Sequence, residues 1–166
     1  MDQGKPSLLA LRRLRKLTAE LGPDLIHSWM YHANIATLFS TILQNHCPIV
    51  WHVHHSANGL QHEKWLTIGV VYLGATLSRT VERIVYCGPQ TAQQHERLGY
   101  DSTRTQVIPN GTDCTEYRPN PSTRMLIRYE LGIPEHVPVV GHVARLHPMK
   151  DQGNLLRAAN IVWQEY

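Results

Sequence analysis

Two cations, Arg145 and Lys150, flank a proline at the junction between an apolar run and a predicted helix. The run Val137–Ala144 has the composition of a buried strand, and the helix is predicted to begin near Lys150 or Asp151. In a doubly wound α/β sheet, ligands bind beyond the carboxyl ends of the strands, where helix N-termini favour anions. Arginine offers a planar fork of donors and lysine a compact charge, so the pattern predicts a diphosphate site. The alternative is that both side chains are solvated loop cations or pair with Asp151 or Glu165.

A histidine pair forms a second candidate site. His52 and His54, in the segment WHVHH, should lie on one face of a strand because side chains alternate along it. Two such histidines at a strand end can ligate zinc, so a metal-dependent hydrolase is an alternative function. A catalytic metal site needs further His or carboxylate ligands, and none is evident after the later predicted strands. His54 can also be a satisfied strand-end histidine that takes no part in chemistry.

Composition and charge exclude several classes of protein. The chain has 166 residues, of which 42% are hydrophobic and 17% charged, as is typical of a globular protein with a core. A formal net charge of +3 with interspersed signs gives no argument for nucleic-acid binding. Cys47, Cys87 and Cys114 form no pairing motif, which favours a reducing, cytoplasmic compartment. The longest apolar window, Leu66–Leu77, is too short to cross a bilayer, and the first residues lack a signal-peptide pattern.

The N-terminal region contains a predicted basic amphipathic helix. Leucines recur at helical spacing from Leu8 to Leu21 around the cationic run Arg12–Lys16, and the helix should end near Gly22. A basic run of this kind is usually a solvated helix face. It also fits weak adhesion to an anionic membrane surface, which leaves peripheral contact with the inner face of the membrane open.

Short apolar runs and helical segments alternate along the rest of the chain. This alternation is typical of βαβ units and predicts the α/β class, with a mainly parallel, Rossmann-like sheet covered by helices on both faces. The predicted strands are Asp24–Ser28, Pro48–Val53, Arg83–Cys87, Thr105–Pro109 and Val137–Ala144. The predicted helices between them are Tyr31–His46, Glu63–Thr80, Pro89–Leu98 and Arg124–Leu131.

Turn-forming residues separate two parts of the chain. The segment NGTDCTEYRPNP, residues 110–121, has the composition of a linker, and we place a domain boundary near Pro119–Ser122. Residues 1–120 would form most of an N-terminal Rossmann-like domain, and residues 121–166 the first strand and helix of a C-terminal domain. One strand and one helix cannot bury a core by themselves. The first part also starts with a helix and no preceding strand, so we expect an internal piece of a longer protein.

Four motifs, in order, resemble those of retaining glycosyltransferases of family 4. PDLIHSWMYHANI is similar to the family's P-D-x-I-H-x-x-x-x-H-A-N segment, and PIVWHVHHS to its strand that ends in a histidine at the donor cleft. VIPNGTDCTEYRP resembles the interdomain P-N-G-x-D segment. GHVARLHPMKDQGNLLRAA resembles the strand, loop and helix that open the C-terminal domain. Together these motifs cover almost the whole chain.

The resemblance implies a GT-B enzyme that moves a sugar from a nucleotide-sugar donor to an acceptor with retention at the anomeric carbon. Arg145 and Lys150 match the cations that hold the donor diphosphate, and His54 matches the histidine that faces the donor sugar. Further residues match cleft motifs but have no assigned role; they are His32, Asn34, Asn110 and Gly111.

The resemblance also implies that no metal ion or other cofactor is needed, and that the acceptor is a glycan or lipid-linked glycan. The family's glycine-rich loop and its E-x-x-x-x-x-x-x-E segment are absent from these residues, so the chain should be inactive alone. Ala144 stands where many relatives have glycine, and Gly88 where serine is common. A non-catalytic nucleotide-binding module is a third alternative, because fold does not dictate function.

Overall fold

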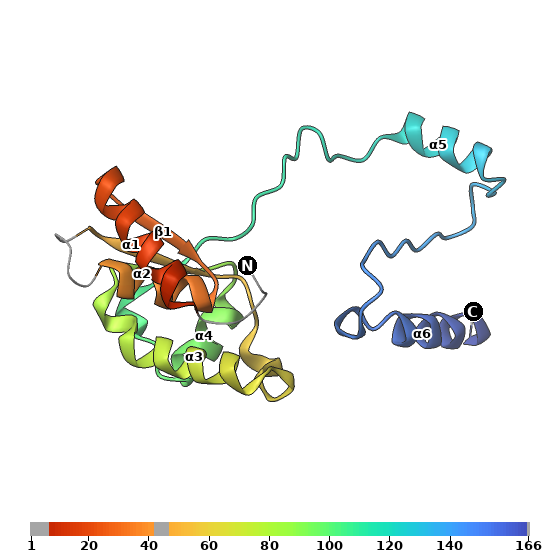
Figure 1. Cartoon of the computed structure of the whole chain (residues 1–166). Helices are drawn as coiled ribbons and strands as arrows, with labels where there is room; N and C mark the ends of the chain where they lie inside the picture. Colours follow the sequence, from red (N-terminus) through yellow and green to blue (C-terminus); the bar gives the residue numbers. More distant parts are fainter. Residues whose placement is uncertain (1–6, 42–46, 166) are drawn as a thin grey trace. The chain divides into compact units, whose positions relative to one another are not determined.

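The computed structural model describes residues 7–41 and 47–165. The chain divides into two units, residues 1–112 and residues 113–166. Figure 1 shows the elements of both units, coloured along the sequence. In the part of the chain that the structure describes, no helix is long and apolar enough to cross a membrane.

The first unit is built on a sheet of four strands, β1 (Ile26–Trp29), β2 (Ile49–Val53), β3 (Arg83–Tyr86) and β4 (Thr105–Val107). The strands lie side by side in sequence order, and each pairs in parallel with the next. The predicted α/β class and parallel sheet are confirmed. The four strands form where the apolar runs predicted them, with small shifts at their ends.

The helices of this unit are α1 (Leu8–Leu21), α2 (Tyr31–Thr41), α3 (Trp65–Leu77) and α4 (Pro89–Arg97). Helix α1 begins where the Ser7 hydroxyl accepts a hydrogen bond from the Ala10 N–H at 3.2 Å. It ends at Gly22, whose left-handed φ of 53° lets its N–H reach the carbonyl of the preceding turn. The predicted helix Tyr31–His46 is confirmed as far as Thr41, and its remainder lies outside the described residues.

The core lies between the sheet and the helices. Trp51, Val53, Ile84 and Tyr86 point from β2 and β3 into it and have no exposed surface. Val71 of α3 is equally buried against them. This alternation of buried residues along the strands fixes which face of the sheet the helices cover.

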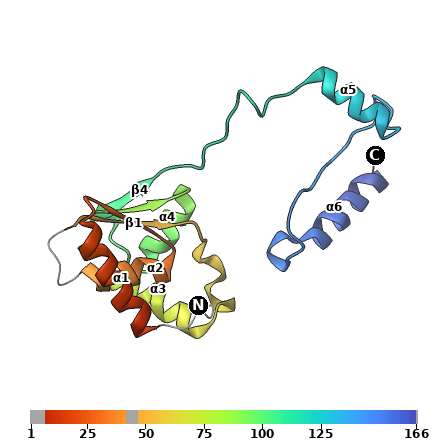
Figure 2. The same cartoon turned by 45° about the horizontal axis from the view of Figure 1, so that its top comes forward.

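The prediction that helices cover both faces of the sheet is wrong for the described residues. Figure 2 shows the helices of the first unit on one side of the sheet. The other face keeps exposed side chains on three strands; they are His27, Trp29, Arg83 and Gln106. The cause is the strand order, because right-handed crossovers that always step in one direction place every connecting helix on the same side.

The second unit contains α5 (Pro121–Glu130), a turn of 3₁₀ helix at Pro148–Lys150, and α6 (Gln152–Glu165). The prediction of a strand at Val137–Ala144 is wrong, because these residues form none. A strand needs a neighbour for its backbone hydrogen bonds, and the described residues 113–165 contain no other strand. Of the side chains described in this unit, only that of Arg128 is buried.

His95 joins two helices inside the first unit. Its side chain is fully buried, and its Nδ1–H donates to the carbonyl of Thr91 at 2.7 Å. Nε2 then accepts from the Tyr31 hydroxyl at 2.8 Å, because a neutral imidazole has one donor and one acceptor nitrogen. Burial lowers the pKa of His95 from the ordinary 6.5, although the bond to Thr91 acts in the opposite direction. The neutral ring therefore ties the start of α2 to α4.

We predict that acid destabilises the chain in part through His95. Its folded pKa lies below the ordinary 6.5, so its contribution is fully present above pH 6.5 and is lost as pH falls through the folded pKa. Urea titrations should show the free energy of unfolding falling below pH 6.5, with a weaker pH dependence in His95→Gln. His136→Gln, a change at an exposed histidine, should keep the slope of the parent. An unchanged slope in His95→Gln would contradict a buried, neutral imidazole.

Candidate functional site

The carboxyl ends of the four strands share one edge of the sheet because all the strands are parallel. Trp29 is the last residue of β1, and His54 directly follows β2. Trp29 pairs with His52, so their side chains lie on the same face of the sheet. Side chains alternate along a strand, so that of His54, two residues after His52, lies on this face as well. It is the face that the helices leave open. His54 thus lies at the strand end where the sequence predicted it.

Four aromatic rings gather here, and we call them the ring cluster: His27, Trp29, His52 and His54. Trp29 and His54 stack, with ring centroids 4.9 Å apart and planes inclined by 12°. His27 and His52 also stack, at 5.3 Å and 9°. The two pairs adjoin, since the His52 centroid lies 4.4 Å from that of Trp29 and 4.1 Å from that of His54. Trp29 is 52% exposed and His52 only 9% exposed, so the cluster has an open surface and a covered base.

The covered base of the ring cluster lacks hydrogen-bond partners. Both ring nitrogens of His52 are buried, and neither has a partner among the described residues. Burial, followed by the neighbouring His54 and His27, lowers the pKa of His52. The ring is therefore neutral at neutral pH, with one donor and one acceptor nitrogen. A buried polar group without a hydrogen bond lowers the stability of the fold by about 1–3 kcal/mol. Most buried polar side chains therefore have a partner, and His52 is an exception among the described residues.

The histidine pair at this strand end was also a candidate metal site. His52 and His54 do share a face, as the alternation predicted. Among residues 7–41 and 47–165, however, no three His, Cys, Asp or Glu side chains come together in a way that could hold a metal ion. The described residues thus do not supply the ligand set that a metal-dependent hydrolase would need.

The turn between β1 and α2 carries backbone strain beside the ring cluster. Met30 has a φ of 71°, which is uncommon for a residue other than glycine. Its N–H donates to the carbonyl of His52 at 2.8 Å, and its carbonyl accepts from the N–H of Asn34. The sheet and the helix hold the turn from both sides. Strained residues of this kind are frequent at functional sites. Trp29, which directly precedes Met30, is therefore a candidate site residue.

The two predicted cleft residues of α2 point in different directions. His32 is exposed in the first turn of the helix, whereas Asn34 is 2% exposed. In the amide orientation that satisfies its neighbours, Asn34 Nδ2 donates to Ser28 Oγ at 2.8 Å and to the Ser28 carbonyl at 3.1 Å. Asn34 therefore connects α2 to β1, and its place in a cleft stays a prediction. Asn110 and Gly111 are both exposed in the segment that follows β4.

Arg145 and Lys150 belong to one loop of the second unit, directly before α6. Both are exposed. The Gln152 side chain donates to the carbonyl of Arg145 at 2.6 Å, and the Lys150 N–H donates to the carbonyl of His147 at 2.9 Å. The helix begins at Gln152, slightly later than predicted, so Lys150 precedes its first turn. The loop is a folded turn that carries both cations.

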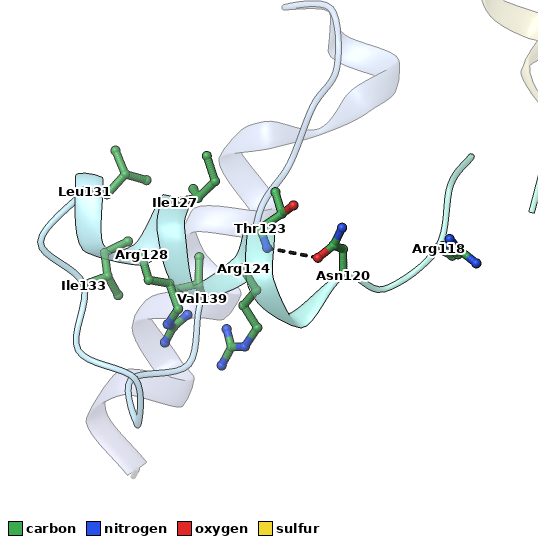
Figure 3. A pocket seen from close by; sticks show the side chains of 9 residues that line it. All are labelled: Arg118, Asn120, Thr123, Arg124, Ile127, Arg128, Leu131, Ile133 and Val139. Atoms are coloured by element: carbon green, nitrogen blue, oxygen red, sulfur yellow. Dashed lines mark hydrogen bonds between the residues drawn. The ribbon is translucent and has the colours of Figure 1, made fainter. Parts of the chain in front are cut away.

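An open pocket of about 440 Å³ lies on α5 in the same unit (Figure 3). Its apolar lining comes from Ile127, Leu131, Ile133 and Val139, and Arg118 and Arg124 also border it. The guanidinium of Arg128 donates to the carbonyls of Pro134, Glu135 and Val137, and so ties the following loop to the helix. No predicted site residue lines this pocket. Most of these aliphatic side chains are exposed.

Comparison with known proteins connects most of the chain to one enzyme family. Residues 2–116 match the family Glycosyltransferase Family 4. A D-inositol 3-phosphate glycosyltransferase of Nocardia farcinica is 40% identical over 70 residues, which are 42% of this chain and 15% of that protein. The corresponding enzyme of Salinispora arenicola is 36% identical over 73 residues, or 42% and 16% of the two chains.

Solved structures of Anabaena HepE share the fold. Its complex with UDP-glucose aligns with 90% of this chain and 39% of HepE, with a TM-score of 0.73 and 23% identity. Its complex with UDP aligns with 93% and 42%, with a TM-score of 0.76 and 26% identity. The protein belongs to Glycosyltransferase Family 4 and matches part of a GT-B fold. It spans well under half the length of these relatives.

We predict that His52 titrates below 6.5 because Trp29 and the other rings cover it. Trp29→Ala should raise the pKa of His52 by admitting water to the ring, and His54→Gln should raise it less, because the neighbouring charge is the smaller cause. NMR titration of the imidazole resonances measures both. Trp65→Ala, which removes another exposed indole, should leave the pKa of His52 unchanged. An ordinary pKa for His52 in the parent chain would contradict the covered base of the cluster.

Proposed function

We propose that this chain is part of a retaining glycosyltransferase that moves a sugar from a nucleotide-sugar donor to a glycan or lipid-linked acceptor. The observation that carries the proposal is the loop before α6, in which Arg145 and Lys150 are both exposed. It is supported by the match of residues 2–116 to Glycosyltransferase Family 4. The UDP bound to the related HepE makes a UDP-sugar the first donor to test.

In this proposal the two cations hold the donor diphosphate. The departing nucleotide gains negative charge as the glycosidic bond breaks, and preorganised positive groups lower the energy of that transition state. Hydrogen bonds to the backbone of Arg145 and Lys150 order the loop from which the two side chains extend. The cations would also do the work that a divalent metal does in other transferases. His54 faces the donor sugar, and acceptor contacts come from the first unit.

We predict that Arg145→Ala and Lys150→Ala each lower kcat/KM by about 10²- to 10³-fold in a protein that carries these residues with the rest of the second domain. The loss falls on kcat if the contacts strengthen as the nucleotide leaves, and on KM if they hold the diphosphate equally throughout. Lys150→Arg should restore little, because a guanidinium cannot replace a compact ammonium.

The control for both variants is Arg157→Ala, which removes an exposed cation of α6 from the same unit. It should keep the activity of the parent. His54→Ala should lower turnover while sparing binding of the free nucleoside diphosphate, as measured by calorimetry. If both cation variants bind that product as tightly as the parent and turn over normally, the diphosphate site does not exist.

A second prediction concerns the 166-residue chain by itself. It should transfer no sugar, because the E-x-x-x-x-x-x-x-E segment that contacts the donor in relatives is not among its residues and the reacting groups cannot be held in place. Incubation with UDP-glucose and a glycan acceptor, followed by chromatography of the products, measures this. Turnover by the purified chain would overturn the expectation.

Measurements of binding and of sugar transfer together separate the alternative functions. A transferase predicts nucleoside diphosphate binding that depends on the phosphates and survives a chelator. A hydrolase built on His52 and His54 predicts metal uptake that is lost in His52→Ala. A non-catalytic module predicts that a longer protein binds nucleotide without transferring sugar.

A further inference from the structure

Helix α3 is apolar on its exposed side as well as on its buried side. Its sequence, WLTIGVVYLGATL, contains no charged residue, and Val71, Gly74 and Ala75 are buried. The exposed residues recur at helical spacing on the opposite side; they are Trp65, Leu66, Gly69, Tyr72, Leu73 and Thr76. We call them the α3 stripe. Trp65 is 78% exposed and Tyr72 52%. A helix that is apolar all round is normally enclosed by protein or lipid, and the described residues leave this stripe uncovered.

The neighbouring helix α2 continues this uncharged surface. It packs against both α1 and α3, and Figure 2 shows the three helices on one side of the sheet. Its sequence, YHANIATLFST, contains no lysine, arginine, aspartate or glutamate. His32, Ala33 and Phe39 are exposed and are spaced for one helix face. Two adjacent helices therefore present aromatic and aliphatic groups to the outside.

Helix α1 supplies positive charge beside these two helices. Arg12 and Arg13 are exposed and form no ion pair with another described residue. Lys16 is exposed as well, and its Nζ lies 3.6 Å from the Glu20 carboxylate, the acidic group of this helix. The exposed side chains of α1, α2 and α3 together are here called the helix-layer surface. It combines an uncharged apolar area with a cationic border.

Cations also stand at both ends of the α3 stripe. Lys64 directly precedes the helix and Arg79 follows it, and both are exposed. Glu63, the carboxylate next to Lys64, is half-buried, with its Oε1 3.8 Å from Nε2 of His55. The charge that borders the stripe is thus mainly positive. Apolar residues with tryptophan and tyrosine, bordered by lysine and arginine, are typical of helices that lie in a membrane interface.

We propose that the helix-layer surface binds an anionic lipid bilayer, with the α3 stripe among the headgroups and the cations of α1 at the lipid phosphates. Indole and phenol rings suit this depth because they are apolar with one polar group. Arginine and lysine near an anionic bilayer strengthen the contact electrostatically. A protein partner would have to match apolar groups and cations in one arrangement, whereas an anionic bilayer offers both at every position. The inference does not depend on the proposed sugar transfer.

Sedimentation with lipid vesicles tests the contact. The purified 166-residue chain should sediment with vesicles of equal parts phosphatidylglycerol and phosphatidylcholine, and not with vesicles of phosphatidylcholine alone. Binding should weaken as the salt concentration rises, because salt screens the cations. Tryptophan emission should shift to the blue when anionic vesicles are added, and this shift should be lost in Trp65→Phe.

Two variants separate the charged and the apolar contributions. Arg12→Gln combined with Arg13→Gln should weaken binding to the anionic vesicles about thirtyfold, on the scale of a factor of five for each cation. Trp65→Ala should weaken it about tenfold, on the scale of removing one large apolar side chain from water. Both changes are at exposed positions, and circular dichroism verifies that each variant is folded.

Matched controls make the same changes in the second unit. Arg118→Gln combined with Arg124→Gln removes two exposed arginines, and Trp163→Ala removes an exposed indole. Both should keep the vesicle affinity of the parent. A loss in these controls equal to that in the variants of the first unit would mean a nonspecific attraction, and would overturn the assignment to the helix-layer surface.

Three further results would overturn the proposal. The first is the absence of binding to the anionic vesicles. The second is self-association of the chain in analytical ultracentrifugation that Leu73→Glu abolishes, which would mean that a second copy covers the α3 stripe. The third is a longer protein that fails to bind the vesicles although the 166-residue chain binds them, which would mean that another segment covers the stripe. Sugar transfer by a longer protein, present or absent, leaves the result of the vesicle experiment unchanged.

Discussion

The handedness of the crossovers determines the arrangement of the first unit. Each of β1, β2 and β3 is followed by a helix and then by a parallel strand that always lies on the same side of it. Right-handed connections of this kind place the connecting helices on one face of the sheet. Parallel pairing also brings all the carboxyl ends to one edge. The same constraint thus leaves one face open and brings Trp29, His52 and His54 together there, although they come from separate strands.

The chain distributes two kinds of chemistry between its units. The first unit offers aromatic rings beside a buried histidine whose ring nitrogens have no hydrogen-bond partner among the described residues. The second offers two cations on a turn before a helix. In the proposed function, the first kind of group faces the neutral sugar of the donor and the second holds its anionic diphosphate. In the second unit, α5 and the loop after it leave aliphatic side chains exposed around an open pocket.

Local signals in the sequence predicted most of the helices and strands, but not which strands pair or in which register. Gly22 ends α1 as expected, and the apolar runs before His54 and Cys87 became β2 and β3. Residues Val137–Ala144 have a high strand propensity but form no strand. A strand also needs a neighbouring strand to pair with, and the local sequence does not show whether one is present. The ring cluster was missed because it depends on the register of β1 against β2. The pairing of Trp29 with His52 becomes visible only when the strands are aligned.

Retaining transfer from a nucleotide-sugar, as proposed above, predicts the anomeric configuration of the product. A protein that contains these residues with a complete second domain would be incubated with UDP-glucose and a glycan acceptor in the presence of a chelator, and the new linkage would be read by proton NMR. We expect transfer without added metal and an α-linked product, which keeps the anomeric configuration of the donor. A β-linked product, or transfer that disappears with the chelator, would contradict it.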